Sequence, residues 1–164
     1  MKKNTKYCYT PAQRFEAHGS REYDFGDKRL PSVTTILSRT KDQAFLEKWK
    51  ARVGEEEAER IKNVSSKRGT SMHKFLENHV TDIGYHDLSA VGKEARPMAQ
   101  KIIEDGLCNV SEYYGSEVSL YYPDLYAGST DLVCLHNGVE AIVDFKQANR
   151  PKREEWIDDY FLQI

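Results

Sequence analysis

The spacing of apolar residues changes along the chain from a helical period to a strand period. In the first part, apolar side chains recur every three or four positions, as in an amphipathic helix. Helices are predicted over residues 33–37, 41–52, from 55 onward, 70–81 and 90–105. Pro31 and Ser32 mark the start of the first helix, and Gly54 separates the second from the third. Residues 1–30 mix aromatic residues with turn formers, so we expect an irregular segment with room for a short hairpin.

Beyond Cys108 the apolar residues alternate with polar ones, which is typical of half-buried strands. One strand is predicted to end near Tyr122. Two more, over 125–136 and 139–146, flank an Asn-Gly pair, which is the strongest short hairpin signal. A last helix is predicted to begin at Pro151, a residue that suits the first helical position. Its apolar face would comprise Trp156, Ile157, Tyr160 and Phe161.

This order of helices, strands and helix predicts one domain of mixed α/β (α+β) class over residues 31–164. Both hairpin strands are apolar on both faces, so we expect a central mixed sheet flanked by helices on both sides. The chain has 164 residues, 39% hydrophobic and 30% charged, which excludes a disordered chain. We expect neither a membrane span nor a signal peptide, because no apolar run is long enough to span a bilayer and none follows the basic first residues. Three distant cysteines favour a reducing compartment, and we expect a cytoplasmic protein.

Charge divides the chain into two unlike parts. Residues 1–74 carry 17 basic and 10 acidic side chains, a net charge of +7, whereas residues 75–164 carry 7 and 16, a net charge of −9. The first part could face phosphates while the second gathers carboxylates around a cation. Two solvated helical surfaces of opposite sign would give the same totals, so charge alone leaves both interpretations open.

The hairpin brings two acidic residues together. A two-residue turn at Asn137 and Gly138 places Asp131 directly across from Asp144, with Lys146 on the same face. Opposed Cβ atoms lie about 4.5–5.5 Å apart, so the two carboxylates repel unless a cation lies between them or one is protonated. Hard divalent cations such as Mg²⁺ bind carboxylate oxygens, and Lys146 could orient or deprotonate a water. An ion-paired trio at an exposed strand end is the structural alternative.

A second candidate pair lies on the helix predicted over 70–81. His73 and Glu77 are four residues apart, so they share one face at the edge of the apolar stripe. From that edge a ligand could reach into a site beneath the helix. Two such residues are more commonly a surface pair, and this alternative stays open. His79 lies on the stripe itself and is interpreted as a packed core histidine.

Four short motifs follow one another in a characteristic order. They are Gly-x-x-x-His at 69–73, Gly-x-x-Asp at 128–131, Asp-x-Lys at 144–146 and the later Gln163. Together they resemble the RecB-like branch of the PD-(D/E)XK nuclease superfamily, and residues 31–37 with Phe45 and Trp49 resemble phage exonucleases of that branch. The chain is also similar to mitochondrial exonucleases of the branch. The resemblance covers residues 31–164 and implies a restriction-endonuclease-like core preceded by a helical region.

The resemblance assigns roles to the matching residues. His73, Asp131 and Asp144 would bind Mg²⁺ or Mn²⁺, together with the backbone carbonyl of Phe145. Lys146 would position the attacking water, so that it, Asp131 and Asp144 form the catalytic set. Gln163 would complete that set by holding the site or the substrate strand.

Other residues receive lesser roles from the same resemblance. Glu77 and Glu117 are candidates for an outer shell or a second metal. Members of the branch often thread a single-stranded end through a helical arch, and the basic, aromatic segment 41–74 would be its wall. The candidates for substrate binding there are Trp49, Lys67, Arg68 and Thr70.

The resemblance implies a metal-dependent DNA exonuclease of phage or bacterial recombination, repair or replication, acting on DNA with a free or single-stranded end. The alternatives are a non-catalytic remnant that binds nucleic acid or a protein partner, and an endonuclease or junction resolvase. The family's Tyr four residues after Gln163 is missing and the last helix is unfinished at Ile164, so we expect an incomplete C-terminal part. An iron–sulfur cluster is not expected, because three scattered cysteines cannot supply four ligands.

Overall fold

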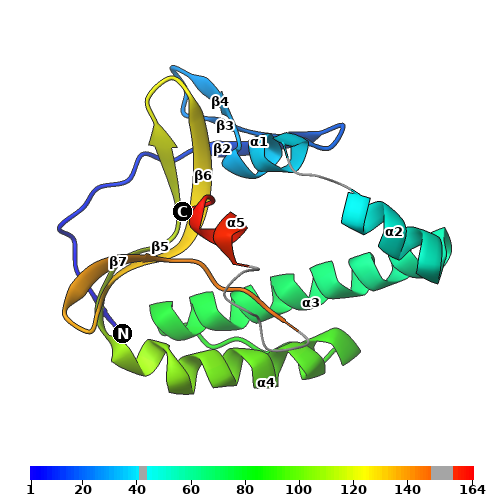
Figure 1. Cartoon of the computed structure of the whole chain (residues 1–164). Helices are drawn as coiled ribbons and strands as arrows, with labels where there is room; N and C mark the ends of the chain where they lie inside the picture. The colour runs from blue at the N-terminus through cyan, green and yellow to red at the C-terminus, as the bar shows by residue number, and fades with distance from the viewer. Residues whose placement is uncertain (41–43, 149–156) are drawn as a thin grey trace.

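The computed structural model describes residues 1–40, 44–148 and 157–164, which form a mixed α+β fold (Figure 1). Its strands are β1 Lys2–Lys3, β2 Gln13–Ala17, β3 Ser20–Asp24, β4 Arg29–Pro31, β5 Val110–Tyr122, β6 Tyr126–His136 and β7 Val139–Val143. Its helices are α1 Val33–Thr40, α2 Ala44–Val53, α3 Glu55–Thr81, α4 Ala90–Asp105, the 3₁₀ helix η1 Leu107–Asn109 and α5 Asp158–Phe161. The predicted mixture of helices and strands is confirmed.

The larger sheet has the strand order β1-β5-β6-β7, with β1 parallel to β5 and the other pairs antiparallel. The predicted register of the β6–β7 hairpin is confirmed, since His136 lies opposite Val139. Asn137 and Gly138 both have positive φ angles, 49° and 78°, as a two-residue hairpin turn requires. The second strand is shorter than predicted because pairing stops at Val143. The Asp-x-Lys motif therefore lies just past β7.

α3 is one continuous helix of 27 residues. Its predicted start at Glu55 is confirmed, but the predicted boundary near residue 70 is wrong. Gly69 is the weakest helix former in that region, and one interior glycine costs about 1 kcal/mol, which is too little to end a helix that packs along its length. The helix ends at Asp82, which adopts φ 59° and donates its N–H to carbonyls of the last turn.

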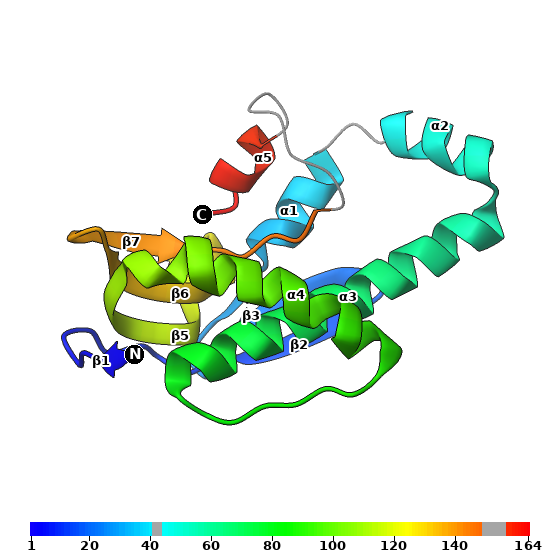
Figure 2. The same cartoon turned by 90° about the horizontal axis from the view of Figure 1, so that it is seen from below.

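α3 and α4 lie side by side and cover one face of the larger sheet (Figures 1 and 2). The fully buried side chains of this core include Met72, Leu76, Leu132 and Cys134. His79, predicted to be packed in the core, is instead exposed. The preceding residue, Asn78, is buried, and the side-chain amide of Asn78 donates a hydrogen bond to the Lys74 carbonyl.

Part of the opposite face of the sheet is covered by the N-terminal arm, residues 4–9, a layer that we did not predict. The ring of Tyr9 lies 2.7 Å from where a β-carbon on Gly115 would be, so only glycine fits there. Gly115 pairs with Val133, whose side chain points away from the helices because its neighbour Leu132 points toward them. Lys6 and Tyr7 extend the arm to Glu140 on β7 through hydrogen bonds of 2.5 and 2.9 Å.

Residues 1–30 are more ordered than predicted, because β2, β3 and β4 form a second antiparallel sheet. The hairpin allowed by the sequence is the β2–β3 pair, which turns at His18 and Gly19. Tyr23 and Leu30 of this sheet are buried against Ala127 of β6. This small core fixes the second sheet beside the β5–β6 hairpin.

The C-terminal helix α5 has only four residues, Asp158–Phe161. Gln163 lies in the turn after it, so its predicted place on a helix is wrong. Pro151 and Trp156, predicted to begin and face this helix, lie outside the described residues. Among the described residues, the helices lack an apolar stretch of the length that crossing a membrane requires.

Candidate metal centre

Three potential metal ligands converge from three elements. His73 of α3, Glu117 of β5 and Asp131 of β6 each offer a ligand atom, and these atoms all lie within 4.8 Å of one another. The burial of Met72 and Leu76 against β6 orients α3 so that His73 reaches the strand. Packing of the helix on the sheet thus assembles the cluster.

Asp131 is the central residue of this cluster. Its Oδ1 lies 3.0 Å from Nδ1 of His73, and its Oδ2 accepts a hydrogen bond of 2.5 Å from the backbone N–H of Phe145. The Asp131 side chain is only 11% exposed, so both interactions form in a place with little water. The hydrogen bond to Asp131 raises the pKa of His73, against the lowering effect of burial.

Glu117 lies directly across β5–β6 from Asp131, because the flanking pairs are Ser116 with Leu132 and Val118 with Thr130. It adopts a left-handed φ of 52°, an unusual conformation for a glutamate. Loss of water around its carboxyl, followed by the negative charge of Asp131, raises the pKa of Glu117 to about 7. The residue that the sequence assigned a lesser role thus belongs to the central group.

Asp144 and Lys146 form an ion pair beside this group. The Asp144 side chain is 12% exposed and that of Lys146 is 31% exposed. Asp131 and Asp144 line one cleft, as the hairpin register predicts. Asp144 is nevertheless outside the tight group of three, and its carboxylate neutralises Lys146 instead.

The cleft has a volume of about 600 Å³ and is bordered by both sheets and by α3. Of the predicted site residues, His73, Glu77, Glu117, Asp131, Asp144, Lys146, Gln163 and Thr70 line it. The described lining does not include Lys67, Arg68 or Trp49. Lys67 is exposed and Trp49 is half-buried on α2, so their proposed contacts with substrate stay predictions.

Glu77 pairs with a lysine and not with His73. Its carboxylate lies 2.8 Å from Nζ of Lys74, three residues before it on α3, and both residues line the cleft. The surface-pair alternative therefore describes Glu77, while His73 turns inward to Asp131.

Gln147, next to Lys146, was not predicted from the sequence as a residue of the site. Its side-chain amide donates a 2.5 Å hydrogen bond to the Ser65 carbonyl and accepts one of 2.8 Å from Nε of Arg68. Arg68 is also 3.4 Å from Glu94, so its side chain, predicted to bind substrate, joins α3 to neighbouring elements. These contacts tie the segment after β7 to α3. Nothing in the sequence connects Gln147 to a helix almost eighty residues earlier.

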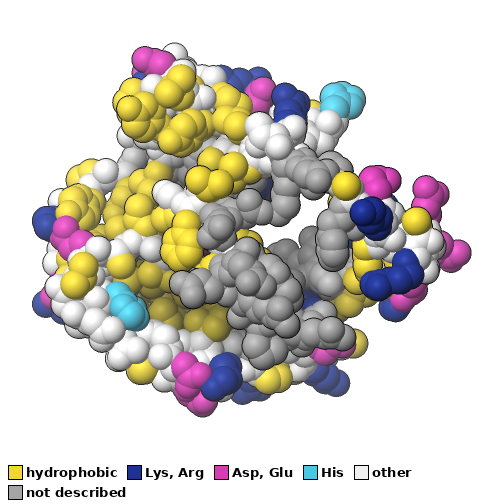
Figure 3. Space-filling view, in the orientation of Figure 1, with side chains coloured by type: hydrophobic (Ala, Val, Ile, Leu, Met, Phe, Trp, Pro, Cys, Tyr) yellow, Lys and Arg dark blue, Asp and Glu magenta, His cyan; other side chains and the backbone are white. Residues whose placement is uncertain are grey.

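A smaller apolar hollow of about 240 Å³ adjoins the cleft and shares Ser129, Asp144 and Gln163 with it. Tyr122 and Tyr126 stack on its rim with ring centroids 5.7 Å apart. In space-filling view, apolar side chains gather over this end of the β5–β6 hairpin (Figure 3). The cleft thus has a charged floor, formed by the group of three and the Asp144–Lys146 pair, and beside it an aromatic rim, formed by Tyr122 and Tyr126.

The donor set fits a hard divalent cation. Two carboxylates and an imidazole converge, and the carboxylates are held close enough to raise the pKa of one of them. Oxygen ligands with one imidazole suit Mg²⁺ or Mn²⁺, whereas the described part of the group contains no thiolate that would favour a softer metal. A cation there would relieve the repulsion between Glu117 and Asp131.

No protein-family model matches the chain. It is similar to mitochondrial genome maintenance exonuclease 1 of Mus musculus, with 31% identity over 134 residues. The matched region makes up 75% of this chain and 38% of the mouse protein. The chain therefore spans well under half the length of the mouse protein, although the match covers most of the chain itself.

Proposed function

We propose that this protein is a metal-dependent nuclease that hydrolyses phosphodiester bonds in DNA, most simply as an exonuclease. The observation that carries the proposal is the convergence of His73, Glu117 and Asp131 in one cleft with the Asp144–Lys146 pair. The similarity to a mitochondrial exonuclease supports the same reaction. A role in phage or bacterial recombination, repair or replication is part of this proposal.

The metal would be held by Asp131 and His73, with Glu117 or Asp144 completing the oxygen ligands. Bound there, Mg²⁺ or Mn²⁺ would polarise a phosphodiester, lower the pKa of a water and stabilise the leaving oxygen. The Phe145 carbonyl, expected to join the ligands, stays a proposal. The Phe145 N–H orients the carboxylate of Asp131.

We infer that Lys146 acts on the attacking water. Its ammonium group contacts Asp144 and lies 5.6 Å from the ring centroid of Tyr160, so it is held on both sides. A positive charge at this point attracts hydroxide and the negative charge that develops on the phosphate. Gln163 lines the same cleft and would hold the strand near this lysine.

The substrate end would lie between the charged floor and the aromatic rim. Unpaired bases can stack on tyrosine rings, and Tyr122 and Tyr126 present theirs next to the cleft. This arrangement favours a single-stranded end over an intact duplex. Trp49 and Lys67 on the helices before it would then contact more distant nucleotides.

A cleavage assay tests the proposal. The purified chain should degrade linear single-stranded DNA labelled at either end when Mg²⁺ or Mn²⁺ is present, and should leave it intact in EDTA. A D131A/D144A double variant should be inactive. D124N is the matched control, because Asp124 is an exposed acid in the β5–β6 turn with φ 60°, a conformation that asparagine also adopts.

The same assay separates the alternatives. A circular single strand is left uncut by an exonuclease and cut by an endonuclease. Cleavage by the double variant at the rate of the parent chain would refute the mechanism. A chain that binds DNA equally well with and without metal, and cleaves none, would be the non-catalytic remnant.

A further inference from the structure

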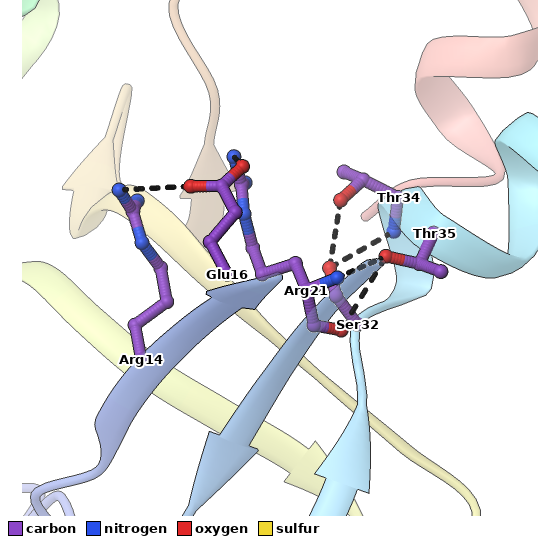
Figure 4. Close-up of polar contacts among 6 residues, drawn as sticks. All are labelled: Arg14, Glu16, Arg21, Ser32, Thr34 and Thr35. Carbon is purple, nitrogen blue, oxygen red and sulfur yellow. Dashed lines mark hydrogen bonds and ion pairs between the residues drawn. The ribbon is translucent and has the colours of Figure 1, made fainter. Parts of the chain in front are cut away.

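The cleft has a second polar wall that the proposed reaction does not use. Arg14 of β2 and Arg21 of β3 line it, together with the hydroxyl-bearing Ser32 and Thr34 at the start of α1 (Figure 4). Arg14 and Arg21 lie on the small sheet, whereas Ser32 follows β4 and Thr34 lies in the first turn of α1. From the sequence, no catalytic or binding role is predicted for any of the four.

We propose that Arg14 and Arg21 bind a phosphate group of the DNA strand next to the one being cleaved. The inference rests on the proposed function, since it concerns the same cleft and the same substrate. An acidic floor repels a polyanion, so a strand that enters this cleft needs cations near its other phosphates. The two arginines are placed to supply them.

Arg21 is held in place through its backbone. Its N–H donates a 2.9 Å hydrogen bond to the hydroxyl of Thr35, and its carbonyl accepts one of 2.8 Å from the N–H of Ser32. On the same face of the sheet, Tyr23 is buried against Ala127 of β6. The guanidinium group therefore starts from a fixed point on the wall of the cleft.

One nitrogen of this guanidinium group has no partner. Nε of Arg21 is buried and lacks a hydrogen-bond acceptor among the described residues. A buried donor without an acceptor is unfavourable. A phosphate oxygen that accepts a hydrogen bond from this N–H would remove that cost, and arginine forms strong hydrogen bonds with phosphate. Nη2 of Arg21 lies 3.1 Å from Oε1 of Glu16, and the residue lines the cleft that the substrate would enter.

Glu16 does not account for the pair of arginines. It lies 3.9 Å from Nη2 of Arg14 and is itself 56% exposed, and ion pairs in such positions are weak. The carboxylate of Glu16 is also outside the described lining of the cleft. A phosphate, which accepts paired hydrogen bonds from guanidinium groups, can therefore compete with it.

The test measures DNA binding by fluorescence anisotropy, with Ca²⁺ replacing Mg²⁺ and a gel to verify that the DNA stays intact. We expect an R14A/R21A variant to bind a single-stranded 12-mer about 10-fold more weakly than the parent chain. The slope of log affinity against log salt should become shallower by about 0.7 for each phosphate that the variant no longer neutralises. The matched control is R29A, because Arg29 is 52% exposed, pairs with Glu22, and lies on the opposite face of the same sheet.

A second variant acts in the opposite direction and removes no arginine. E16Q frees both guanidinium groups from their ion pair, so we expect affinity to rise two- to fivefold. It also serves if the double variant does not fold, since Glu16 is exposed. Binding by R14A/R21A with the slope and affinity of R29A, or no gain from E16Q, would overturn the inference.

The oligonucleotides distinguish where the phosphate comes from. A 12-mer with hydroxyls at both ends is compared with the same strand carrying a 5′- or a 3′-phosphate. A weakening in R14A/R21A that is equal for all three assigns an internal phosphodiester, and a weakening confined to one assigns that terminal phosphate.

Failure of this inference can be distinguished from failure of the proposed function. If the parent chain cleaves no DNA but the arginine variants still bind DNA more weakly, the proposed function fails and the phosphate site stands. If the parent chain cleaves DNA and the arginine variants bind DNA as tightly as the parent chain, the phosphate site fails and the proposed function stands.

Discussion

The side-chain amide of Gln147 packs directly against the backbone of Gly69 on α3. A β-carbon at position 69 would lie 2.8 Å from Nε2 of Gln147. The glycine therefore admits the close approach through which the segment carrying Lys146 is tied to the helix carrying His73. Both ends of the Gly-x-x-x-His motif therefore have a structural role, since Gly69 makes room for Gln147 and His73 contacts Asp131.

Replacing Gly69 by alanine should reduce activity more than stability. Alanine favours the helix by about 1 kcal/mol, and the displaced Gln147 loses two hydrogen bonds worth about 1 kcal/mol each, so the net destabilisation is only about 1 kcal/mol. We expect the melting temperature to change by a few degrees at most and the cleavage rate to fall about 10-fold. G84A is the control, since Gly84 has open space around it. Full activity of G69A would contradict the positioning role of Gln147.

Replacing Lys146 by alanine should separate catalysis from metal binding. The variant lacks the cation placed beside the reacting water, and a decrease of about 100-fold or more in kcat is expected. Its affinity for Mn²⁺, measured by calorimetry, should be unchanged or higher, because Asp144 loses its neutralising partner. A variant that no longer binds Mn²⁺ would show that Lys146 is structural.

The two secondary glutamates should differ in metal binding. E117Q removes a carboxylate from the group of three, and we expect Mn²⁺ affinity to fall about 10-fold, equivalent to about 1.4 kcal/mol. E77Q should change the affinity less than twofold, because Glu77 is outside the group of three and its carboxylate is paired with Lys74. Equal decreases in both variants would place Glu77 among the ligands.

Glu117 also predicts a pH dependence of stability in the absence of metal. Its pKa in the folded chain is about 7, above the ordinary value of 4.5, so the folded state binds this proton more tightly than the unfolded state. Its contribution to stability is therefore complete below pH 4.5 and lost as the pH rises to 7 and beyond. His73, whose pKa is also raised, acts in the same direction at higher pH.

Thermal melts in EDTA check this dependence. The E117Q variant should match the parent chain near pH 4.5 and melt at a higher temperature at about pH 8, since glutamine removes the ionised carboxylate. A constant difference between the two proteins across this range would mean that Glu117 ionises normally.

Tyr9 offers a simple test of the N-terminal arm. Its ring packs on Gly115, and its hydroxyl is buried without a hydrogen-bond partner among the described residues. Y9F removes that unpaired group and should raise the free energy of unfolding by up to about 1 kcal/mol in a urea titration. Y9A should lower it by about 3 kcal/mol or more, because it removes the ring that covers the sheet. A destabilised Y9F variant would reveal a partner for the hydroxyl.

The amino-acid sequence alone determined the local features of this protein. Periodicity predicted α4 and the start of α3, and Asn137-Gly138 predicted the hairpin register, because each depends on residues close together in the chain. That register was enough to predict that Asp131 and Asp144 share one cleft. His73 and Glu117 required, in addition, the family resemblance.

Only the tertiary structure decided which side chains meet. The pairing of Glu117 with Asp131 depends on the β5 register and on a positive φ, and that of Gln147 with Gly69 on how closely the helix approaches the sheet. The arm that covers part of the larger sheet, and the small sheet that places Arg14 and Arg21 on the cleft, join segments over a hundred residues apart in the chain. Such contacts are set by the packing of apolar faces, and no local pattern in the sequence records them.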